Sequence, residues 1–154
     1  MKVGFINLLV YQFIYHIILL FAMLQKTRKG RIRGVKFFNE LPHLYSHKLI
    51  LTEAGRLTTN QIEAARRIIS KQVKRVGTYK IHVRASTSVT SKPSEVRMGK
   101  GKGAIDYYIA RVKAGQLLFT IRGLNSIESY RTFMRASRKL PLKIKIISAS
   151  EVID

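Results

Sequence analysis

The sequence contains no cysteine, so the chain can form no disulfide, no cysteine-ligated zinc site and no thiol nucleophile. Acidic residues are also scarce: 8 Asp and Glu stand against 29 Lys and Arg in 154 residues, which gives a formal net charge of +21. Because like charges repel within a compact chain, such an excess points to a polyanionic partner, either nucleic acid or an anionic membrane surface. The hydrophobic fraction of 46% supplies enough apolar material for a core and excludes a disordered basic tail.

The few acidic residues are scattered, and no pair has a spacing that suits general acid–base catalysis. No serine lies in a nucleophile elbow. His43 and His47 are four positions apart, a spacing that can hold a metal on a helix, but Pro42 and the lack of a third ligand argue against it. The sequence therefore predicts no enzyme, no cofactor, no metal site and no small-molecule substrate.

Residues 3–24 form a long uncharged apolar run. A helix of ~20 such residues would cross a hydrocarbon core ~30 Å thick. The run lacks the Arg and Ser of an organelle transit peptide. Three interpretations remain open for it: a membrane anchor, a segment packed against protein neighbours, or an extension lying in a crevice.

A dense basic stretch, KTRKGRIRGVK, follows at residues 26–36 and contains no acid. Gly30 and Gly34 interrupt any helix, so we expect an extended basic arm. The alternative is a solvated or juxtamembrane run of charge. The six cations of the arm are Lys26, Arg28, Lys29, Arg31, Arg33 and Lys36.

Residues 55–77 show the clearest helical pattern, with Thr58 and Gln61 as a capping box and Gly77 at the end. Apolar residues recur at helical spacing on the side expected to pack: Ile62, Ala65, Ile69, Val73 and Val76. Cations occupy or flank the opposite side: Arg66, Arg67, Lys71, Lys74 and Arg75. The helix is expected to pack by one face and present cations on the other.

A second helix is predicted over residues 126–140, capped by Asn125 or Ser126 and stopped by Pro141. Its expected inner stripe is Ile127, Tyr130 and Met134. Its expected outer stripe is Arg131, Arg135 and Arg138.

Alternating apolar residues predict strands at 78–84, 105–113, 116–122 and 142–147. The second and third strands are expected to form a hairpin that turns at Ala114 and Gly115. Residues 85–104 are interpreted as one long polar loop, a length that is often functional. This order of elements predicts an α+β fold, an antiparallel sheet sandwich covered by two helices, with a basic N-terminal arm and a long Gly/Lys loop.

The long loop contains RMGKGKG at 97–103, and glycine beside lysine suggests phosphate binding. A nucleotide-binding P-loop is excluded because no Ser or Thr follows Lys102 and a strand, not a helix, comes next. A dinucleotide fingerprint fails on the same ground and lacks the acid expected ~20 residues later. The remaining readings are a mobile solvated loop or a loop whose glycines let the backbone approach nucleic acid.

Four motifs occur in the order and separation found in the universal large-subunit ribosomal protein sixteen family, and the chain strongly resembles that family over about residues 23–147. The motifs are GRLTTNQIEAARR (55–67), KPSEVRMGKGKG (92–103), GQLLF (115–119) and RKLPLK (138–143). MLQKTRKGRIRG (23–34) is similar to the ordinary N-terminus of the family. Residues 37–54 depart from the usual segment, and residues 1–22 have no counterpart.

The resemblance implies a structural constituent of the large ribosomal subunit with an α+β fold, which binds large-subunit rRNA near A-site tRNA and the peptidyl-transferase region and joins late in assembly. It divides the chain into a hydrophobic extension (1–22), an rRNA-threading arm (23–36) and one domain (37–154). The cations of the arm and of both helices are expected to contact rRNA. The functional-centre loop carried over by motif is Arg97, Met98, Gly99, Lys100, Gly101, Lys102 and Gly103.

The composition and the extension favour an organellar chain in the mitochondrial matrix, within the mitochondrial ribosome. Residues 1–22 would then contact neighbouring ribosomal proteins or the inner membrane. A membrane-anchored basic protein that binds RNA or lipid is the alternative function.

Overall fold

The computed structural model describes residues 25–36, 46–74 and 76–148. Two helices and seven strands lie within these ranges, and the α+β class is confirmed. Residues 1–22, His43 and Arg75, about which the sequence made predictions, lie outside the described residues.

One sheet has four antiparallel strands in the order β3-β6-β1-β7. These are β3 (Thr78–Ile81), β6 (Leu117–Arg122), β1 (Ser46–Leu51) and β7 (Ile144–Ile147). Leu49 lies opposite Phe119 on one side and Ile146 on the other, so a central position of the sheet is apolar across three strands. Strands β3 and β7 match two of the strands that alternation predicted.

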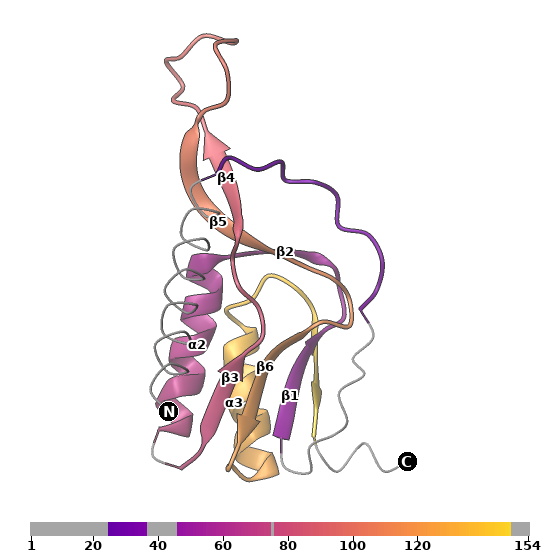
Figure 1. Ribbon diagram of the computed structural model, residues 1–154. Coiled ribbons are helices and arrows are strands. Elements are labelled where there is room, and N and C mark those ends of the chain that lie inside the picture. The colour runs from indigo at the N-terminus through magenta and orange to yellow at the C-terminus, as the bar shows by residue number, and fades with distance from the viewer. Residues whose placement is uncertain (1–24, 37–45, 75, 149–154) are drawn as a thin grey trace, which may run out of the picture.

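The other sheet has three antiparallel strands in the order β2-β5-β4. These are β2 (Gly55–Thr58), β5 (Ala104–Val112) and β4 (Thr87–Ser91). Strands β4 and β5 rise out of the body of the protein and carry the loop 92–103 at their tip (Figure 1). The Gly/Lys motif is thereby placed at the end of a two-stranded extension.

The predicted hairpin of residues 105–122 is wrong, because its two strands belong to different sheets. Strand β5 pairs with β2 and β4, whereas β6 pairs with β1 and β3. The chain does turn between them, since Gln116 N donates to Lys113 O at 3.2 Å. However, Gly115 N donates to Leu51 O at 2.7 Å, so the turn is anchored to the end of β1 and the two strands diverge.

Two further boundaries differ from the sequence prediction. Gly55–Thr58, expected to open a helix, forms β2, and Thr87–Ser91, expected to lie in a loop, forms β4. Both segments pair with the long strand β5. Partners distant in the chain override weak local signals in short strands, and neither segment alternates clearly on its own.

Helix α2 (Thr59–Val73) confirms the predicted capping box. Thr58 Oγ1 accepts from Gln61 N at 3.3 Å, and Thr58 N donates to Gln61 Oε1 at 2.9 Å. Ala65, Ile69 and Val73 are buried, as expected, but the helix ends before Val76, whose exposure is 64%. Val76 N and Gly77 N instead donate to Val73 O, which closes the helix.

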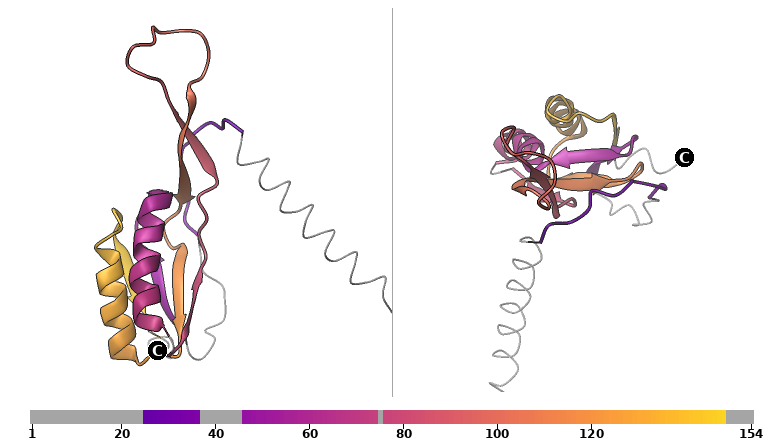
Figure 2. Two further views of the ribbon diagram at one scale, coloured as in Figure 1. Left: turned by 90° about the vertical axis from the view of Figure 1, so that its left-hand side faces the viewer. Right: turned by 90° about the horizontal axis from the view of Figure 1, so that it is seen from above.

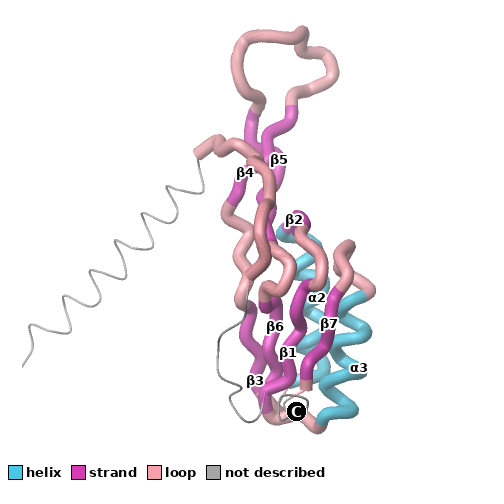
Figure 3. The backbone as a smooth tube through the Cα atoms, turned by 90° about the vertical axis from the view of Figure 1, so that its right-hand side faces the viewer, coloured by secondary structure: helices cyan, strands magenta, loops and turns pink. Residues whose placement is uncertain are grey.

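Helix α3 (Ser126–Ser137) packs beside α2, and both helices cover the same face of the four-stranded sheet (Figure 3). The buried core between these layers includes Leu49, Leu51, Leu57, Ile69, Phe119, Ile121 and Phe133.

The predicted inner stripe of α3 is wrong: Ile127, Tyr130 and Met134 are 67%, 55% and 40% exposed. The buried positions are Ser129, Thr132, Phe133 and Ala136. Two of these are small polar residues, which hid the stripe from a count of apolar residues. Thr132 Oγ1 donates to Glu128 O at 2.7 Å, so its hydroxyl is satisfied within the helix and can be buried.

Candidate nucleic-acid interface

The basic arm, described here from residue 25 to residue 36, runs extended along the surface of the domain (Figure 1). At its start, Ser88 Oγ on β4 donates to Gln25 O at 2.7 Å and accepts from Thr27 N at 3.1 Å. At its end, Lys36 N donates to Ala114 O at 2.8 Å, beside a parallel bridge between Val35 and Ala114. The arm is therefore attached at both ends rather than hanging free.

Two glycines let the arm follow this path. Gly30 and Gly34 have φ values of +60° and +80°, in the left-handed region that side chains disfavour. A hydrogen bond from Arg56 Nη2 on β2 to Gly30 O, 2.9 Å long, holds the arm against that strand. The glycines that were expected to prevent a helix thus also shape the extended course of the arm.

The arm presents its cations to solvent. All six are exposed, and no ion pair joins any of them to an acid within the described ranges: Lys26, Arg28, Lys29, Arg31, Arg33 and Lys36. Unpaired cations at this density repel one another, so the surface is suited to a polyanion.

The arm and the Gly/Lys loop meet at the base of the loop. Lys26 Nζ donates to Lys102 O at 3.1 Å, and Lys102 Nζ donates to Thr27 O. These reciprocal bonds join segments far apart in the sequence. The two cationic segments therefore form one surface, which the sequence could not establish.

The loop turns through three consecutive left-handed residues. Gly99, Lys100 and Gly101 have φ values of +91°, +52° and +83°. Nothing lies within 4 Å of where a Cβ would stand at Gly99 or Gly101, so these glycines serve the backbone path and leave the loop narrow. Gly103 differs, because a Cβ there would stand 2.2 Å from Ser91 O, where the loop closes onto β4.

The cationic side chains of the loop are exposed to solvent. Arg97, Lys100 and Lys102 are exposed, and Met98 is 99% exposed. Lys92 Nζ donates to Gly99 O and braces the loop from within. Strand β5 follows the loop, whereas a P-loop is followed by a helix, so the prediction that this loop is not a P-loop is confirmed.

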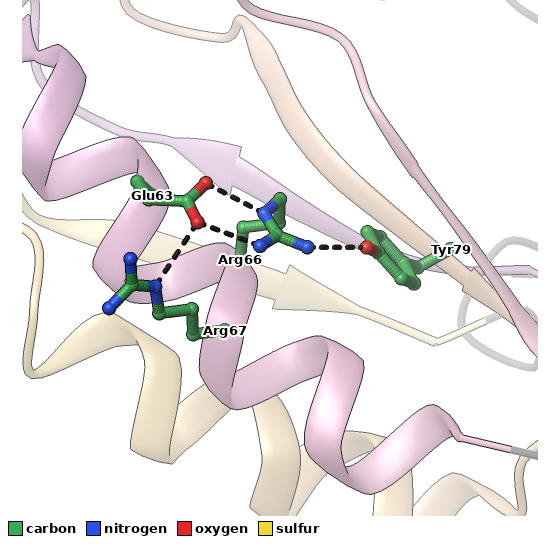
Figure 4. A network of polar contacts seen from close by, with 4 residues as sticks. All are labelled: Glu63, Arg66, Arg67 and Tyr79. Atoms are coloured by element: carbon green, nitrogen blue, oxygen red, sulfur yellow. Dashed lines mark hydrogen bonds and ion pairs between the residues drawn. The ribbon is translucent and has the colours of Figure 1, made fainter.

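On α2, Arg66 is largely committed to partners within the chain (Figure 4). Its Nε and Nη2 donate to the two carboxylate oxygens of Glu63, each at 2.7 Å, and Nη1 donates to Tyr79 Oη at 3.0 Å. Arg67 Nε also reaches Glu63, at 3.1 Å. Hydrogen bonds from Arg66 and then Arg67 lower the pKa of Glu63 to about 2, and the Arg66 bond lowers the pKa of Tyr79.

The remaining helix cations stay available. The Arg67 side chain is 75% exposed despite its contact with Glu63, and Lys71 and Lys74 are exposed. On α3, Arg131, Arg135 and Arg138 are exposed as predicted. Figure 2 shows the helices and the arm on opposite sides of the sheets, so the predicted cations divide into two surfaces.

Sequence reasoning missed Arg56 on β2 and Arg111 on β5. Their Cα atoms are direct partners in the antiparallel ladder, and both side chains reach the arm at Gly30. Each arginine stands between two less polar neighbours, in GRL and ARV. In β2 this pattern is too short to predict a strand, and only the pairing of β2 with β5 brings the two arginines together.

The two histidines within the described ranges belong to the fold. His47 on β1 is 8% exposed, and this burial lowers its pKa. His82 Nε2 lies 3.1 Å from Thr120 Oγ1. Within the described ranges no group of three His, Asp or Glu could hold a metal ion, and no helix there is long and apolar enough to span a membrane.

Comparison with known proteins decides the family. The model of the family described as ribosomal protein L16p/L10e matches residues 22–147. The chain belongs to this family. Proteins of the L16p/L10e family are structural, non-enzymatic components of the ribosome, so the protein is a ribosomal protein and not an enzyme.

Three curated relatives illustrate the similarity. "Large ribosomal subunit protein uL16" of Sphingopyxis alaskensis is 44% identical over 124 residues, which make up 80% of this chain and 87% of the relative. "Large ribosomal subunit protein uL16c" of Guillardia theta is 44% identical over 80% of this chain and 92% of its own length. "Large ribosomal subunit protein uL16" of Buchnera aphidicola is also 44% identical, over 80% of this chain and 90% of its own length.

Proposed function

We propose that this L16p/L10e protein binds large-subunit rRNA as a non-catalytic scaffold of the large ribosomal subunit. The observation that carries the proposal is the pair of bonds between Lys26 and the loop and between Lys102 and the arm. They combine the arm and the Gly/Lys loop into one cationic surface, and no ion pair among the described residues joins this surface to an acid. The names of the curated relatives, all large-subunit proteins, support the same assignment.

The mechanism follows from the side chains on that surface. Lys and Arg contacts to phosphates fix the register of the protein on RNA without reading its sequence. The narrow backbone at Gly99 and Gly101 allows close approach, while Arg97, Lys100 and Lys102 supply charge. The cations of α2 and α3, on the other side of the sheets, give a second surface for RNA: Arg67, Lys71, Lys74, Arg131, Arg135 and Arg138.

The loop is the part proposed to act at the functional centre. It lies at the tip of the β4–β5 extension, away from the packed core, so it can reach a ligand that the body of the domain does not touch (Figure 1). We assign it a role in shaping the A-site tRNA and peptidyl-transferase region and in late assembly of the subunit.

The remaining assignments concern the ends of the chain and its location. We propose a mitochondrial ribosome, with residues 1–22 as an extension that contacts neighbouring ribosomal proteins, residues 23–36 as the rRNA arm and residues 37–154 as the domain. Fractionation of mitochondria tests this: the protein should sediment with ribosomes after detergent. Recovery in a ribosome-free detergent extract would favour the membrane-anchored alternative instead.

Salt dependence tests the electrostatic mechanism. If ~6–10 phosphates are neutralised, affinity for large-subunit rRNA should fall by ~10³–10⁵ between 50 and 200 mM salt. Arg28→Ala should lower that slope by about one unit, because one phosphate contact is lost. An affinity that does not change with salt would overturn the proposal.

Reconstituted ribosomes test the role of the loop. Arg97→Ala and Lys100→Ala should slow tRNA accommodation or late assembly more than they weaken binding of the protein to rRNA. Lys139→Ala, an exposed cation after α3, is a matched control for the loss of one charge. Normal translation with both loop variants would contradict a functional-centre role.

A further inference from the structure

A shallow cavity of about 640 Å³, open to solvent, lies between the arm and the start of β2. Its walls come from two segments that are separate in the sequence: Arg31, Ile32 and Arg33 on the arm, and Gly55 and Arg56 on β2. The bond from Arg56 Nη2 to Gly30 O holds these walls together. The cavity therefore exists only while the arm is seated on the domain.

The cationic character of this region extends beyond the cavity wall. Arg56 and Arg111 are direct Cα partners on β2 and β5, a position where like charges destabilise a sheet. Arg111 Nη1 stands 2.8 Å from where a Cβ would lie at Gly30, so the two arginines flank the arm at one residue. An anion bound beside Arg56 and Arg111 would offset the repulsion between them and so stabilise the folded protein.

No acid of the described chain offsets these charges. Glu53 bonds to Lys143 and Glu63 to Arg66 and Arg67, and none of the described ion pairs involves Arg31, Arg33, Arg56 or Arg111. All four cations are arginines, whose planar fork binds phosphate through two parallel hydrogen bonds and stacks on flat rings. Lysines would supply the same charge without these geometries.

The size of the cavity indicates more than a phosphate group. Its volume of about 640 Å³ is open to solvent, so it can admit a nucleotide that is still attached to an RNA strand, which an enclosed small-molecule pocket could not. Ile32, half-buried between two arginines, gives the cavity an apolar wall. Bases turned out of an RNA strand are commonly recognised by stacking on guanidinium planes, with phosphates held nearby.

We propose that this cavity binds a single nucleotide turned out of an RNA strand. Its phosphate contacts Arg56 and an arginine of the arm, and its sugar or base packs against Ile32. This proposal rests on the proposed function, because it assumes an RNA partner. It goes further by adding Arg56 to the interface. It also makes affinity depend on the planar shape of the guanidinium group and not on positive charge alone.

Charge-conserving substitutions test the site in the full-length protein with large-subunit rRNA from its own ribosomes. Arg56→Lys and Arg33→Lys should each lower affinity about tenfold, the effect of losing one bidentate charged contact, with the salt slope unchanged. Arg122→Lys, at an exposed position on β6 that belongs neither to the cavity nor to the RNA surfaces described above, should bind as the parent does. Equal affinity of all three variants would overturn the nucleotide site while leaving the salt-dependent function standing.

A second measurement separates loss of the site from loss of the arm's position, since Arg56 also holds Gly30. Large subunits containing the unaltered protein are irradiated with ultraviolet light, and peptides carrying nucleotide adducts are identified by mass spectrometry. An adduct on the peptide containing Ile32 or Arg56 is expected from a base in the cavity. Absence of an adduct from both peptides would overturn the proposal, even if Arg56→Lys weakens binding.

Discussion

The side-chain nitrogen of Lys26 donates a hydrogen bond to the backbone carbonyl of Lys102, a residue 76 positions further along the chain. Lys102 returns a bond to the carbonyl of Thr27. Each of these two lysine side chains thus binds a backbone carbonyl of the other's segment rather than an acid. Their contact makes the position of the loop depend on the seating of the arm.

Removing this contact should loosen the loop. In Lys102→Ala, amide hydrogens of residues 97–103 should exchange faster, because the base of the loop loses its bond to Thr27 O. Hydrogen exchange measured by mass spectrometry checks this. Arg97→Ala, which removes a loop cation without a described bond, is the control and should leave exchange in residues 98–103 as it is.

The capping box gives a stability prediction. Thr58→Ala should destabilise the protein by about 1 kcal/mol, since the amide of Gln61 loses its acceptor and the reciprocal bond loses its geometry. Urea denaturation measures the change. Thr52→Ala, at an exposed position between β1 and β2, serves as control, and a similar loss there would contradict a specific capping effect.

Truncation of two neighbouring residues of α3 should change the free energy of unfolding by very different amounts. Phe133→Ala should cost about 3–5 kcal/mol because Phe133 is fully buried between the helix and the sheet. Met134→Ala should change the free energy of unfolding by less than about 0.5 kcal/mol, because Met134 is 40% exposed. A larger loss of stability in Met134→Ala than in Phe133→Ala would contradict the assignment of Phe133, and not Met134, to the buried side of α3.

The Glu63 network predicts a specific acid response. The pKa of Glu63 is about 2 in the folded protein against an ordinary value of 4.5, so between these values the unfolded chain binds more protons. The stabilisation from Glu63 is therefore complete above pH 4.5 and is lost as the pH falls towards 2. Glu63→Gln should lower the melting temperature at pH 6, with the difference from the parent shrinking over that window. A constant difference would mean that the carboxylate charge is not involved.

Local sequence signals predicted the parts of the fold that local physics controls. Thr58 and Gln61 predicted the start of α2, and alternation predicted β5, β6 and β7, because caps and side-chain periodicity act within a few residues. The extended arm was predicted for a similar reason, from glycines that disfavour a helix. The α+β class followed from these elements together.

The rest depended on contacts distant in the sequence. Whether residues 105–122 form a hairpin is decided by β1 and β2, which give each strand a different partner. The buried side of α3 is set by its packing against α2, where Ser129 and Thr132 fit although they are polar. In the candidate interface, the cations of the arm and the loop were named from sequence, but Arg56 was not, because its role arises only where the arm crosses β2.

Gly115 lies where the arm, β1 and the junction of the two sheets meet. A Cβ at this residue would stand 2.2 Å from Lys36 O, so the arm rests directly on the glycine backbone. The docking place of the arm is therefore assembled from pieces that come together only when both sheets have formed. An incompletely folded chain lacks that place, and the protein would present its ordered cationic surface to RNA only after its own folding is finished.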